Sequence, residues 1–213
     1  ASDIEKAGND PDAQVRRAAI FALGQMKDAD AVELCTRRMK DPDESVRAAA
    51  ATALARIGIG NLEELGKRAL ADKALSVRLA GVDLLAAAHS DDELAALADD
   101  ADPLVGVTAA IAVDKSHPGL GARPLERALA AQEWTVRAGA VNLAGSALGR
   151  DAGLAYAQRL TKDSELAVRL AAARVLAHAG DVADARAIFS SALDSPQRTQ
   201  AAADLAAQGD PAG

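Results

Sequence analysis

The sequence DPDESVRAAAATALA (41–55) recurs in similar form along most of the chain, and this recurrence indicates the fold. Aspartate and proline open it, a valine–arginine pair follows, and alanine or leucine then recurs at helical spacing. Aligned on the arginine, the copies follow one another at steps of 31, 31, 28, 31, 32 and 29 residues. A period of this length is typical of solenoid proteins, in which each repeat stacks on its neighbours. The aligned positions are Arg16, Arg47, Arg78, Gly106, Arg137, Arg169 and Arg198.

Each copy has the features of a helix beginning. Asp41 is followed by Pro42, which suits an N-cap and a first helical position, and Glu44 completes a capping-box pattern. Apolar residues then recur three and four apart, and Gly58 and Gly60 are expected to end the helix. A second amphipathic stretch lies between copies, for example NLEELGKRAL (61–70). The sequence therefore predicts an all-α array of about seven helix pairs.

The two ends of the array differ from its middle. The remnant SDIEKAG (2–8) is too short for a full first helix, which fits a missing N-terminal portion. The last copy carries glutamines where earlier copies are apolar, and this is typical of a polar cap on a solenoid. We therefore expect an incomplete first pair and a capping last pair.

The core pattern Asp-Pro-x-x-x-Val-Arg-x-x-Ala-x-x-x-Leu resembles the HEAT repeat, particularly the short bacterial type of phycobilisome lyases. The resemblance covers about residues 10–206. It implies a right-handed α-solenoid, a HEAT-like superhelix whose concave side is lined by the second helix of each pair. We expect a single repeat domain over residues 1–213. Its irregular junction is DKSHPGLGARP (114–124), where prolines and glycines break helical continuity.

Columns of the aligned repeat predict which side chains pack. Counted from the valine before the arginine, the fourth following position is always Ala or Gly, and the eighth is mostly Leu. These two columns predict close helix contacts and a core stripe. The sixth position shows no packing pattern, so it is expected to face solvent. Its residues are Phe21, Thr52, Asp83, Ile111, Asn142, Arg174 and Ala203.

Aspartate precedes arginine by six residues in four repeats, which predicts a structural ladder of ion pairs. Repeat 4 has Gly106 in place of arginine, and repeat 5 has Ala131 in place of aspartate. If each arginine pairs with the aspartate of the next repeat, both losses fall at one junction and leave no buried charge unpaired. An anion site on the arginine column is the alternative. The predicted contacts are Arg16–Asp41, Arg47–Asp72, Arg78–Asp100 and Arg137–Asp163.

The sequence contains no recognisable catalytic motif. The Gly-x-Ser-x-Gly elbow, phosphate-binding loop and dinucleotide fingerprint are missing, and the missing His-Glu-x-x-His pair makes it unlike HEAT-type iron hydroxylases. His89 and His178 fall near helix ends, and Cys35 is expected to be a packed thiol. Acidic clusters such as Asp99 and Asp100 lack the loop glycine and distal glutamate of an EF-hand. We expect no catalysis, no cofactor and no metal.

Charge and hydropathy limit the partners of the protein. The net charge of −7 argues against nucleic acid and against anionic membrane surfaces, and it favours a soluble protein. No charge-free run of about 18 apolar residues occurs, so membrane insertion is not expected. We expect a monomer rather than an oligomer. The start ASDIEKAGND lacks a signal-peptide core; a cytoplasmic location is favoured, with a secreted or periplasmic mature form left open.

Candidate partner-binding residues lie on the predicted concave wall. Leu79, Val107 and Ile111 form an apolar stripe in repeats 3 and 4, beside Asp83. Trp134 occupies a column that elsewhere holds Glu, Pro and Ser, and tryptophan is common among binding hot spots. Packing between helices is the alternative for the stripe, and packing at the junction is the alternative for Trp134.

Three functions fit these observations. The leading hypothesis is a non-catalytic scaffold or adaptor that binds a protein or peptide partner on its concave face. A bilin lyase-like, chromophore-handling protein is the alternative that the resemblance implies, although aromatic residues are scarce and no nucleophile is well placed. A HEAT-like DNA glycosylase would need a basic concave face with aromatic residues, whereas the stripe is apolar and acidic.

Overall fold

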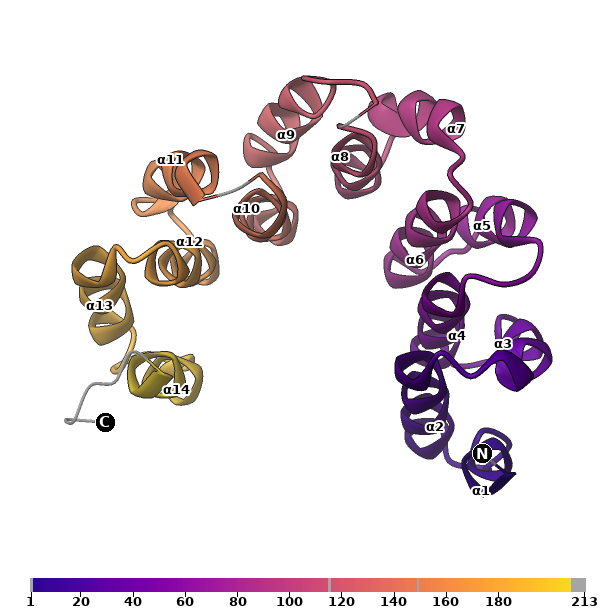
Figure 1. Ribbon diagram of the computed structural model, residues 1–213. Coiled ribbons are helices and arrows are strands. Elements are labelled where there is room, and N and C mark those ends of the chain that lie inside the picture. The colour runs from indigo at the N-terminus through magenta and orange to yellow at the C-terminus, as the bar shows by residue number, and fades with distance from the viewer. Residues whose placement is uncertain (1, 115, 149, 208–213) are drawn as a thin grey trace. The chain divides into compact units, whose positions relative to one another are not determined.

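The computed structural model describes residues 2–114, 116–148 and 150–207, and the regular elements of these residues are all helices (Figure 1). The α-helices are α1 (Ser2–Ala7), α2 (Ala13–Met26), α3 (Val32–Arg38), α4 (Glu44–Ile57), α5 (Leu62–Leu70), α6 (Leu75–Ala87), α7 (Asp91–Ala96), α8 (Pro103–Ala112), α9 (Ala122–Leu129), α10 (Trp134–Ala147), α11 (Arg150–Leu160), α12 (Leu166–His178), α13 (Val182–Ser191) and α14 (Arg198–Ala207). Two 3-10 helices, η1 (Ala29–Ala31) and η2 (Leu97–Asp99), precede α3 and α8. The predicted all-α fold is confirmed.

Packing divides the protein into two compact units, Ala1–Leu120 (unit 1) and Gly121–Gly213 (unit 2). The division falls inside the predicted irregular junction, residues 114–124. The expectation of one domain over residues 1–213, with a right-handed superhelix, concerns how the units join and stays a prediction. Within each unit, successive helix pairs stack on one another as in an α-solenoid.

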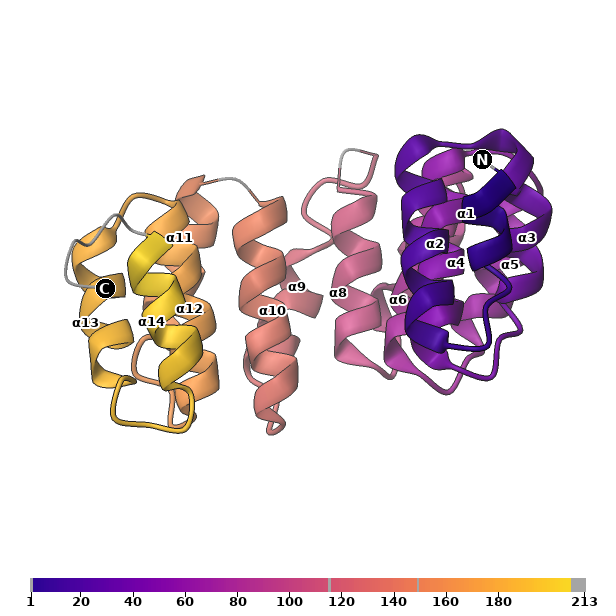
Figure 2. The ribbon, with the colours of Figure 1, turned by 90° about the horizontal axis from the view of Figure 1, so that it is seen from below.

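Unit 1 has two layers of helices. In Figure 1, α2, α4, α6 and α8 form one layer, and α1, α3, α5 and α7 form the other. Helix α4 packs between α2 and α6, α8 packs on α6, and each helix of the other layer contacts its partner in the first. The axes of α2, α4 and α6 run in similar directions (Figure 2). Helix α1 has 6 residues, as does α7, and the expectation of an incomplete first pair stays a prediction.

Unit 2 repeats the same plan with fewer helices. Helices α10, α12 and α14 form one layer, and α9, α11 and α13 form the other (Figure 1). Helix α12 contacts α10, α11 and α13, and α14 packs on α13. The second helices of the pairs therefore share one layer in each unit. For this reason equivalent columns of the repeat occupy equivalent places in the two units.

The helices begin two residues later than the sequence predicted. The N-cap of α4 is Asp43, whose carboxylate accepts the backbone N–H groups of Ser45 and Val46 at 2.8 and 3.4 Å. Asp41 instead accepts the N–H of Asp43, at 3.0 Å, and so shapes the turn before the helix. Glu44 is the first helical residue, so the predicted capping box is wrong. The earlier aspartate is thereby available for another role.

Helix α4 ends at Gly58, as predicted. Gly58 has a φ of 74°, and its N–H donates to the carbonyl oxygen of Leu54 at 2.9 Å. Glycine takes this left-handed conformation without a clash at Cβ. Gly58, the first of the two predicted terminal glycines, therefore ends this helix.

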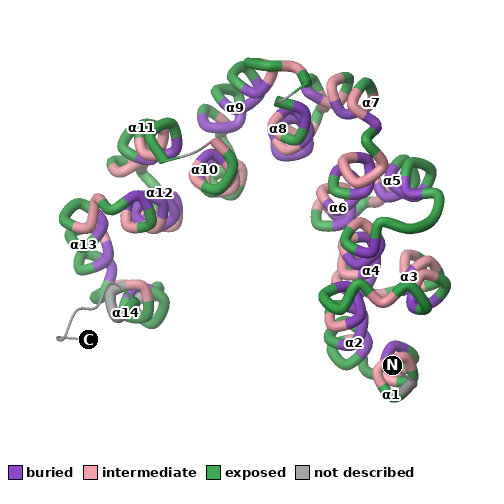
Figure 3. The backbone as a smooth tube through the Cα atoms, in the orientation of Figure 1, coloured by how far each residue is buried: buried purple, intermediate pink, exposed green. Residues whose placement is uncertain are grey.

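The core follows the predicted columns. In the fourth column after valine, every residue is buried, and the eighth column is buried wherever its side chains are described. Buried residues gather on the helix sides that face other helices (Figure 3). Small side chains allow close approach: a Cβ on Gly24 of α2 would lie 2.7 Å from the Cα of Ala53 in α4. Alanine and glycine thus set the spacing between successive second helices.

Candidate functional site

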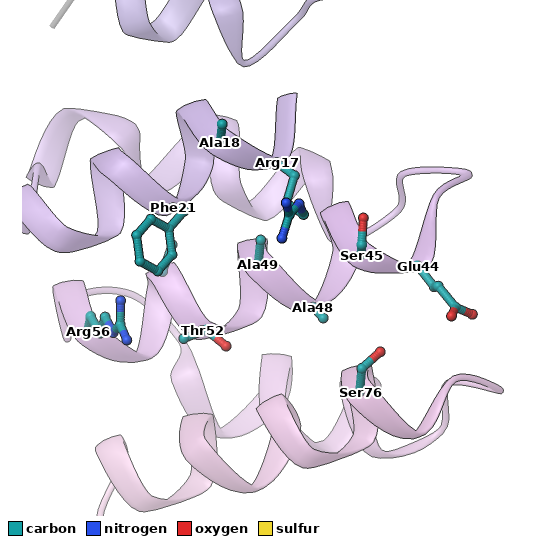
Figure 4. A pocket seen from close by; sticks show the side chains of 11 residues that line it. Arg17, Ala18, Phe21, Glu44, Ser45, Ala48, Ala49, Thr52, Arg56 and Ser76 are labelled. Carbon is teal, nitrogen blue, oxygen red and sulfur yellow. The ribbon is translucent and has the colours of Figure 1, made fainter. Parts of the chain in front are cut away.

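A groove of about 630 Å³ lies on the open face of α2, α4 and α6 in unit 1 (Figure 4). Its floor is made of alanines, and its larger side chains stand at the two ends. All of its residues come from second helices of the first three repeats. The lining residues are Arg17, Ala18, Phe21, Glu44, Ser45, Ala48, Ala49, Thr52, Ala53, Arg56 and Ser76.

The register of the repeat explains why these side chains meet. Phe21 and Thr52 belong to the sixth column, which was predicted to face solvent, and Ala18 and Ala49 belong to the third. Residues three or four apart lie on the same side of a helix, so these columns share one face. Every described side chain of the sixth column has accessible surface. The groove is therefore a direct product of the repeat.

Phe21 and Arg56 form the most distinctive part of the groove. The guanidinium carbon of Arg56 lies 5.4 Å from the centre of the Phe21 ring, within the range of a cation–π contact. Figure 4 shows the two side chains together at one end of the groove, with Arg17 nearer the other end. Phe21 remains 51% exposed. Aromatic side chains, phenylalanine included, and arginine are enriched in protein–protein interfaces relative to the rest of the surface.

The groove carries charges of both signs. Arg17 and Arg56 are exposed, and neither forms a salt bridge within the described parts of the protein. Glu44 lies at the end nearer Arg17 (Figure 4). Asp83, on α6, has accessible surface, yet partial desolvation raises the pKa of its carboxyl, and the nearby Arg56 opposes this rise. Two arginines are thus available for contacts with a ligand.

A second groove, of about 450 Å³, occupies the equivalent register on α10, α12 and α14 of unit 2. Trp134 lines it and is 46% exposed, which places the only tryptophan on an open face. Arg174 also lines this groove, but its guanidinium is paired with Asp204, with Nε 2.8 Å from a carboxylate oxygen. The groove otherwise offers amides, from Asn142 and Gln197 among others. Its chemistry is therefore more polar and less cationic than that of the first groove.

The predicted apolar stripe is only partly accessible. Val107 has no accessible surface, so its proposed contact with a partner is wrong. Leu79 is half-buried and packs against the core cluster between α6 and α8. Accessibility of the second column after valine differs between repeats: Arg17 is exposed and lines the groove, Leu79 is half-buried and Val107 is buried. Ile111 is half-buried like Leu79, and Asp83 is exposed.

The Arg–Asp ladder joins successive repeats, as the sequence predicted. Nε and Nη2 of Arg16 donate to the two carboxylate oxygens of Asp41 at 2.9 and 2.8 Å. The corresponding distances are 2.7 and 2.9 Å for Arg47–Asp72, and 2.8 and 2.8 Å for Arg137–Asp163. In each case Nη1 donates to two backbone carbonyls of the preceding turn. Such two-point pairs fix both distance and orientation between repeats.

The fourth predicted contact is different. Nη2 of Arg78 donates to Asp102 at 2.6 Å, not to the predicted Asp100. The step from Arg78 to Gly106 is 28 residues, shorter than its neighbours, and α7 and η2 share the first-helix position there. This shorter connection brings the N-cap carboxylate of α8 into reach of the arginine, while Asp100 accepts the N–H of Asp102.

Acid titration should reveal the ladder. The guanidinium of Arg47 holds the pKa of Asp72 below its usual value, although burial opposes this. A lowered pKa adds stability that is complete above the unfolded value of about 4 and disappears as pH falls through the folded value. We expect Asp72→Asn to be less stable than wild type at pH 7 and this difference to shrink below about pH 4. Urea unfolding from pH 7 to 3 measures it; a difference independent of pH would contradict this assignment.

The remaining polar candidates take structural places. Cys35 has no accessible surface, and burial raises the pKa of its thiol to about 11, so the thiolate is scarce at neutral pH. His89 follows the end of α6, and His178 is the last residue of α12. Among the residues described, no group of three or more His, Cys, Asp and Glu side chains could hold a metal ion. In the same residues, no helix is both long and apolar enough to cross a membrane.

Comparison with known proteins supports the repeat assignment. A family model described as HEAT repeats matches residues 4–80. Human deoxyhypusine hydroxylase, solved in complex with glycerol, is similar over 97% of this chain and 82% of its own length, with 21% sequence identity and a TM-score of 0.50. A designed armadillo repeat protein is similar over 97% of this chain and 98% of its own length, with 20% identity and a TM-score of 0.37. No curated protein sequence matches this one.

The match to HEAT repeats covers the whole groove of unit 1. Its lining residues, from Arg17 to Ser76, all fall between residues 4 and 80. At 21% identity, the likeness to the human hydroxylase concerns the fold alone. Residues 4–80 are thus HEAT repeats, and the protein has the fold of a helical repeat protein.

Proposed function

We propose that this protein is a non-catalytic scaffold that binds a protein partner through a peptide segment lying in the groove of α2, α4 and α6. The observation that carries the proposal is Phe21, a large aromatic side chain left 51% exposed beside Arg56 on an alanine floor. HEAT-type repeats build extended surfaces rather than enclosed pockets, and such surfaces serve binding. The groove has this form.

The dimensions of the groove suit an extended peptide. Its lining along α4 runs from Glu44 to Arg56, which is about 18 Å at the helical rise of 1.5 Å per residue. An extended peptide of about five or six residues covers this length. Ala48 and Ala49 leave room for the peptide backbone, and Thr52 offers a hydroxyl between them and Arg56. A side chain of the partner that covers the open face of Phe21 would remove apolar surface from water.

Affinity capture from a lysate of the source cells tests the proposal. Wild type, Phe21→Glu and Ile59→Glu are used as baits. Ile59 is the matched control, because it is also 51% exposed but lies between α4 and α5, outside the groove. Circular dichroism first establishes that the three proteins melt alike.

We expect a partner that wild type and Ile59→Glu retain equally and that Phe21→Glu loses. For the purified partner, the Phe21→Glu affinity should fall about 5- to 30-fold, since burial of a half-exposed ring is worth roughly 1–2 kcal/mol. The proposal fails if no protein binds the wild type, or if Phe21→Glu binds as well as Ile59→Glu.

The two alternative functions have less support. A bilin lyase-like role would need an accessible nucleophile, whereas Cys35 is buried and its thiol is protonated at neutral pH. A glycosylase-like role would need a strongly basic face, whereas Glu44 and Asp83 accompany the two arginines of the groove. Catalysis therefore forms no part of the proposal.

A further inference from the structure

Arg169 departs from the ladder in one specific way. Its Nη1 donates to the carbonyl oxygens of Asp163 and Ser164 at 2.7 and 3.0 Å, as Nη1 does in Arg16, Arg47 and the other ladder arginines. In Arg16 and Arg47, Nε and Nη2 then hold a carboxylate of the next repeat. Nε and Nη2 of Arg169 have no acceptor anywhere in residues 2–114, 116–148 and 150–207. The two carbonyl contacts of Nη1 therefore orient the guanidinium, while its Nε–Nη2 edge has no acceptor among these residues.

The sequence explains the missing carboxylate. The ladder aspartate lies five residues before the valine column, as Asp163 does before Val168. In the last repeat this position is Ala192, five residues before Gln197. At the junction between repeats 4 and 5, arginine and aspartate were lost together. At the last junction the arginine is kept and only the aspartate is lost.

The turn of the last repeat also has a backbone N–H group that lacks its usual carboxylate acceptor. In complete repeats, the backbone N–H two residues after the ladder position donates to the same carboxylate; Glu165 does so to Asp163 at 2.9 Å. The equivalent N–H belongs to Asp194, and within the described residues it has no acceptor. In the complete repeats, the arginine edge and this backbone N–H bind the same carboxylate. Among the described residues of the last junction, both donor groups, the Nε–Nη2 edge of Arg169 and the N–H of Asp194, lack that acceptor.

The unused edge of Arg169 can be reached from solvent. The described residues contain no fully buried side-chain nitrogen or oxygen that lacks a hydrogen-bond partner. Because Arg169 is only half-buried and its Nε and Nη2 lack partners, these atoms must retain accessible surface. Asp163, the nearest ladder carboxylate, is occupied by Arg137. A carboxylate from another molecule would thus meet a free, oriented donor pair.

We propose that Arg169 is a carboxylate-binding site, in which Nε and Nη2 hold both oxygens of a carboxylate supplied by a partner protein. The carboxylate takes the place that Asp41 has opposite Arg16. An acidic side chain and the C-terminus of a polypeptide carry the same group, so both sources fit the chemistry. The site lies in unit 2 and is independent of the groove in unit 1.

The test is a titration followed by ¹H–¹⁵N spectra of the arginine Nε–H groups in a chloride-free buffer. The Arg169 signal is assigned by its loss in Arg169→Lys. Three probes are used: Ac-Gly-Glu-Gly-NH₂, Ac-Gly-Ala-Gly with a free C-terminal carboxylate, and Ac-Gly-Gln-Gly-NH₂ as the neutral control. We expect the two carboxylate peptides to move the Arg169 signal saturably, with the signals of Arg16, Arg47 and Arg137 unchanged. The tighter of the two identifies the source of the carboxylate.

Ala192→Asp restores an aspartate at the ladder position of the last repeat and so supplies Arg169 with a partner from within the protein. It should move the Arg169 signal to the range of the three paired arginines, remove the response to the peptides and raise the melting temperature. The rise should vanish when Arg169→Lys is added. If this variant does not fold, the wild-type titration still decides the matter.

Three results would overturn the proposal. The first is a wild-type signal that does not respond to either carboxylate peptide. The second is an equal response to the glutamine peptide, which would show that no carboxylate is recognised. The third is an Arg169 signal that lies in the range of the paired arginines before any peptide is added and leaves that range in Asp194→Asn. That result would mean that the Asp194 carboxylate already binds Nε and Nη2 of Arg169 within the protein.

Discussion

Asp41→Ala should destabilise the protein by about 3–5 kcal/mol, because it removes the acceptor at the centre of a buried network. The Asp41 carboxylate has no exposed surface and accepts from Nε and Nη2 of Arg16, from Nη1 of Arg38 and from the N–H of Asp43. The substitution leaves these donors without their partner and a guanidinium without its countercharge. Urea unfolding followed by circular dichroism measures the loss.

Glu33→Ala is the control for this substitution. Glu33 also pairs with an arginine, Arg37, but the two side chains are 84% and 60% exposed. Pairs of this kind contribute at most about 1 kcal/mol. If Asp41→Ala cost no more than Glu33→Ala, the ladder would not hold the repeats together.

Gly24→Val should cost about 3 kcal/mol, because α2 and α4 touch at this point. A Cβ at Gly24 would lie 2.7 Å from the Cα of Ala53, so the backbones would have to separate. The small gain in helix propensity over glycine offsets only a fraction of a kcal/mol. Thermal and urea unfolding of the variant test the expected loss.

The neighbouring Gln25 supplies the control. It is exposed on the same helix, so Gln25→Val introduces the same side chain without the contact. We expect Gln25→Val to change stability by less than about 1 kcal/mol. Equal losses in the two variants would mean that helix propensity, rather than the close approach of α2 and α4, determines the effect.

The period of the sequence predicted the helices, the core columns and most of the ladder. The pairing of Arg137 with Asp163 was predicted because arginine is missing at Gly106 and aspartate is missing at Ala131. If arginine pairs with the aspartate of the next repeat, these two losses belong to one contact, so a difference between repeats indicated which residues pair. The partner of Arg78 was predicted wrongly because local connection length, not the repeat pattern, selects Asp102 over Asp100. The helix starts were misplaced because both aspartates of the Asp-Pro-Asp turn are potential caps.

The binding surface was harder to predict, because it depends on how helices of different repeats lie side by side. The column of Val107 was predicted to be accessible, but accessibility in that column differs between repeats: Arg17 is exposed, whereas Val107 is buried. Phe21 was in the column predicted to face solvent, and its size was the available signal. Arg56 lies ten residues after the valine, beyond the recurring phrase of the repeat, and only the packing of α4 on α2 brings it to the Phe21 ring.

Site-specific photo-crosslinking determines directly whether a partner lies on α2, α4 and α6. A photo-reactive amino acid is placed at Thr52, in the groove, and separately at Arg68, which is exposed on α5 in the other layer. We expect a partner adduct from position 52 and none from position 68. An adduct from position 68 alone would contradict this expectation and would place the partner on the opposite face of the repeats.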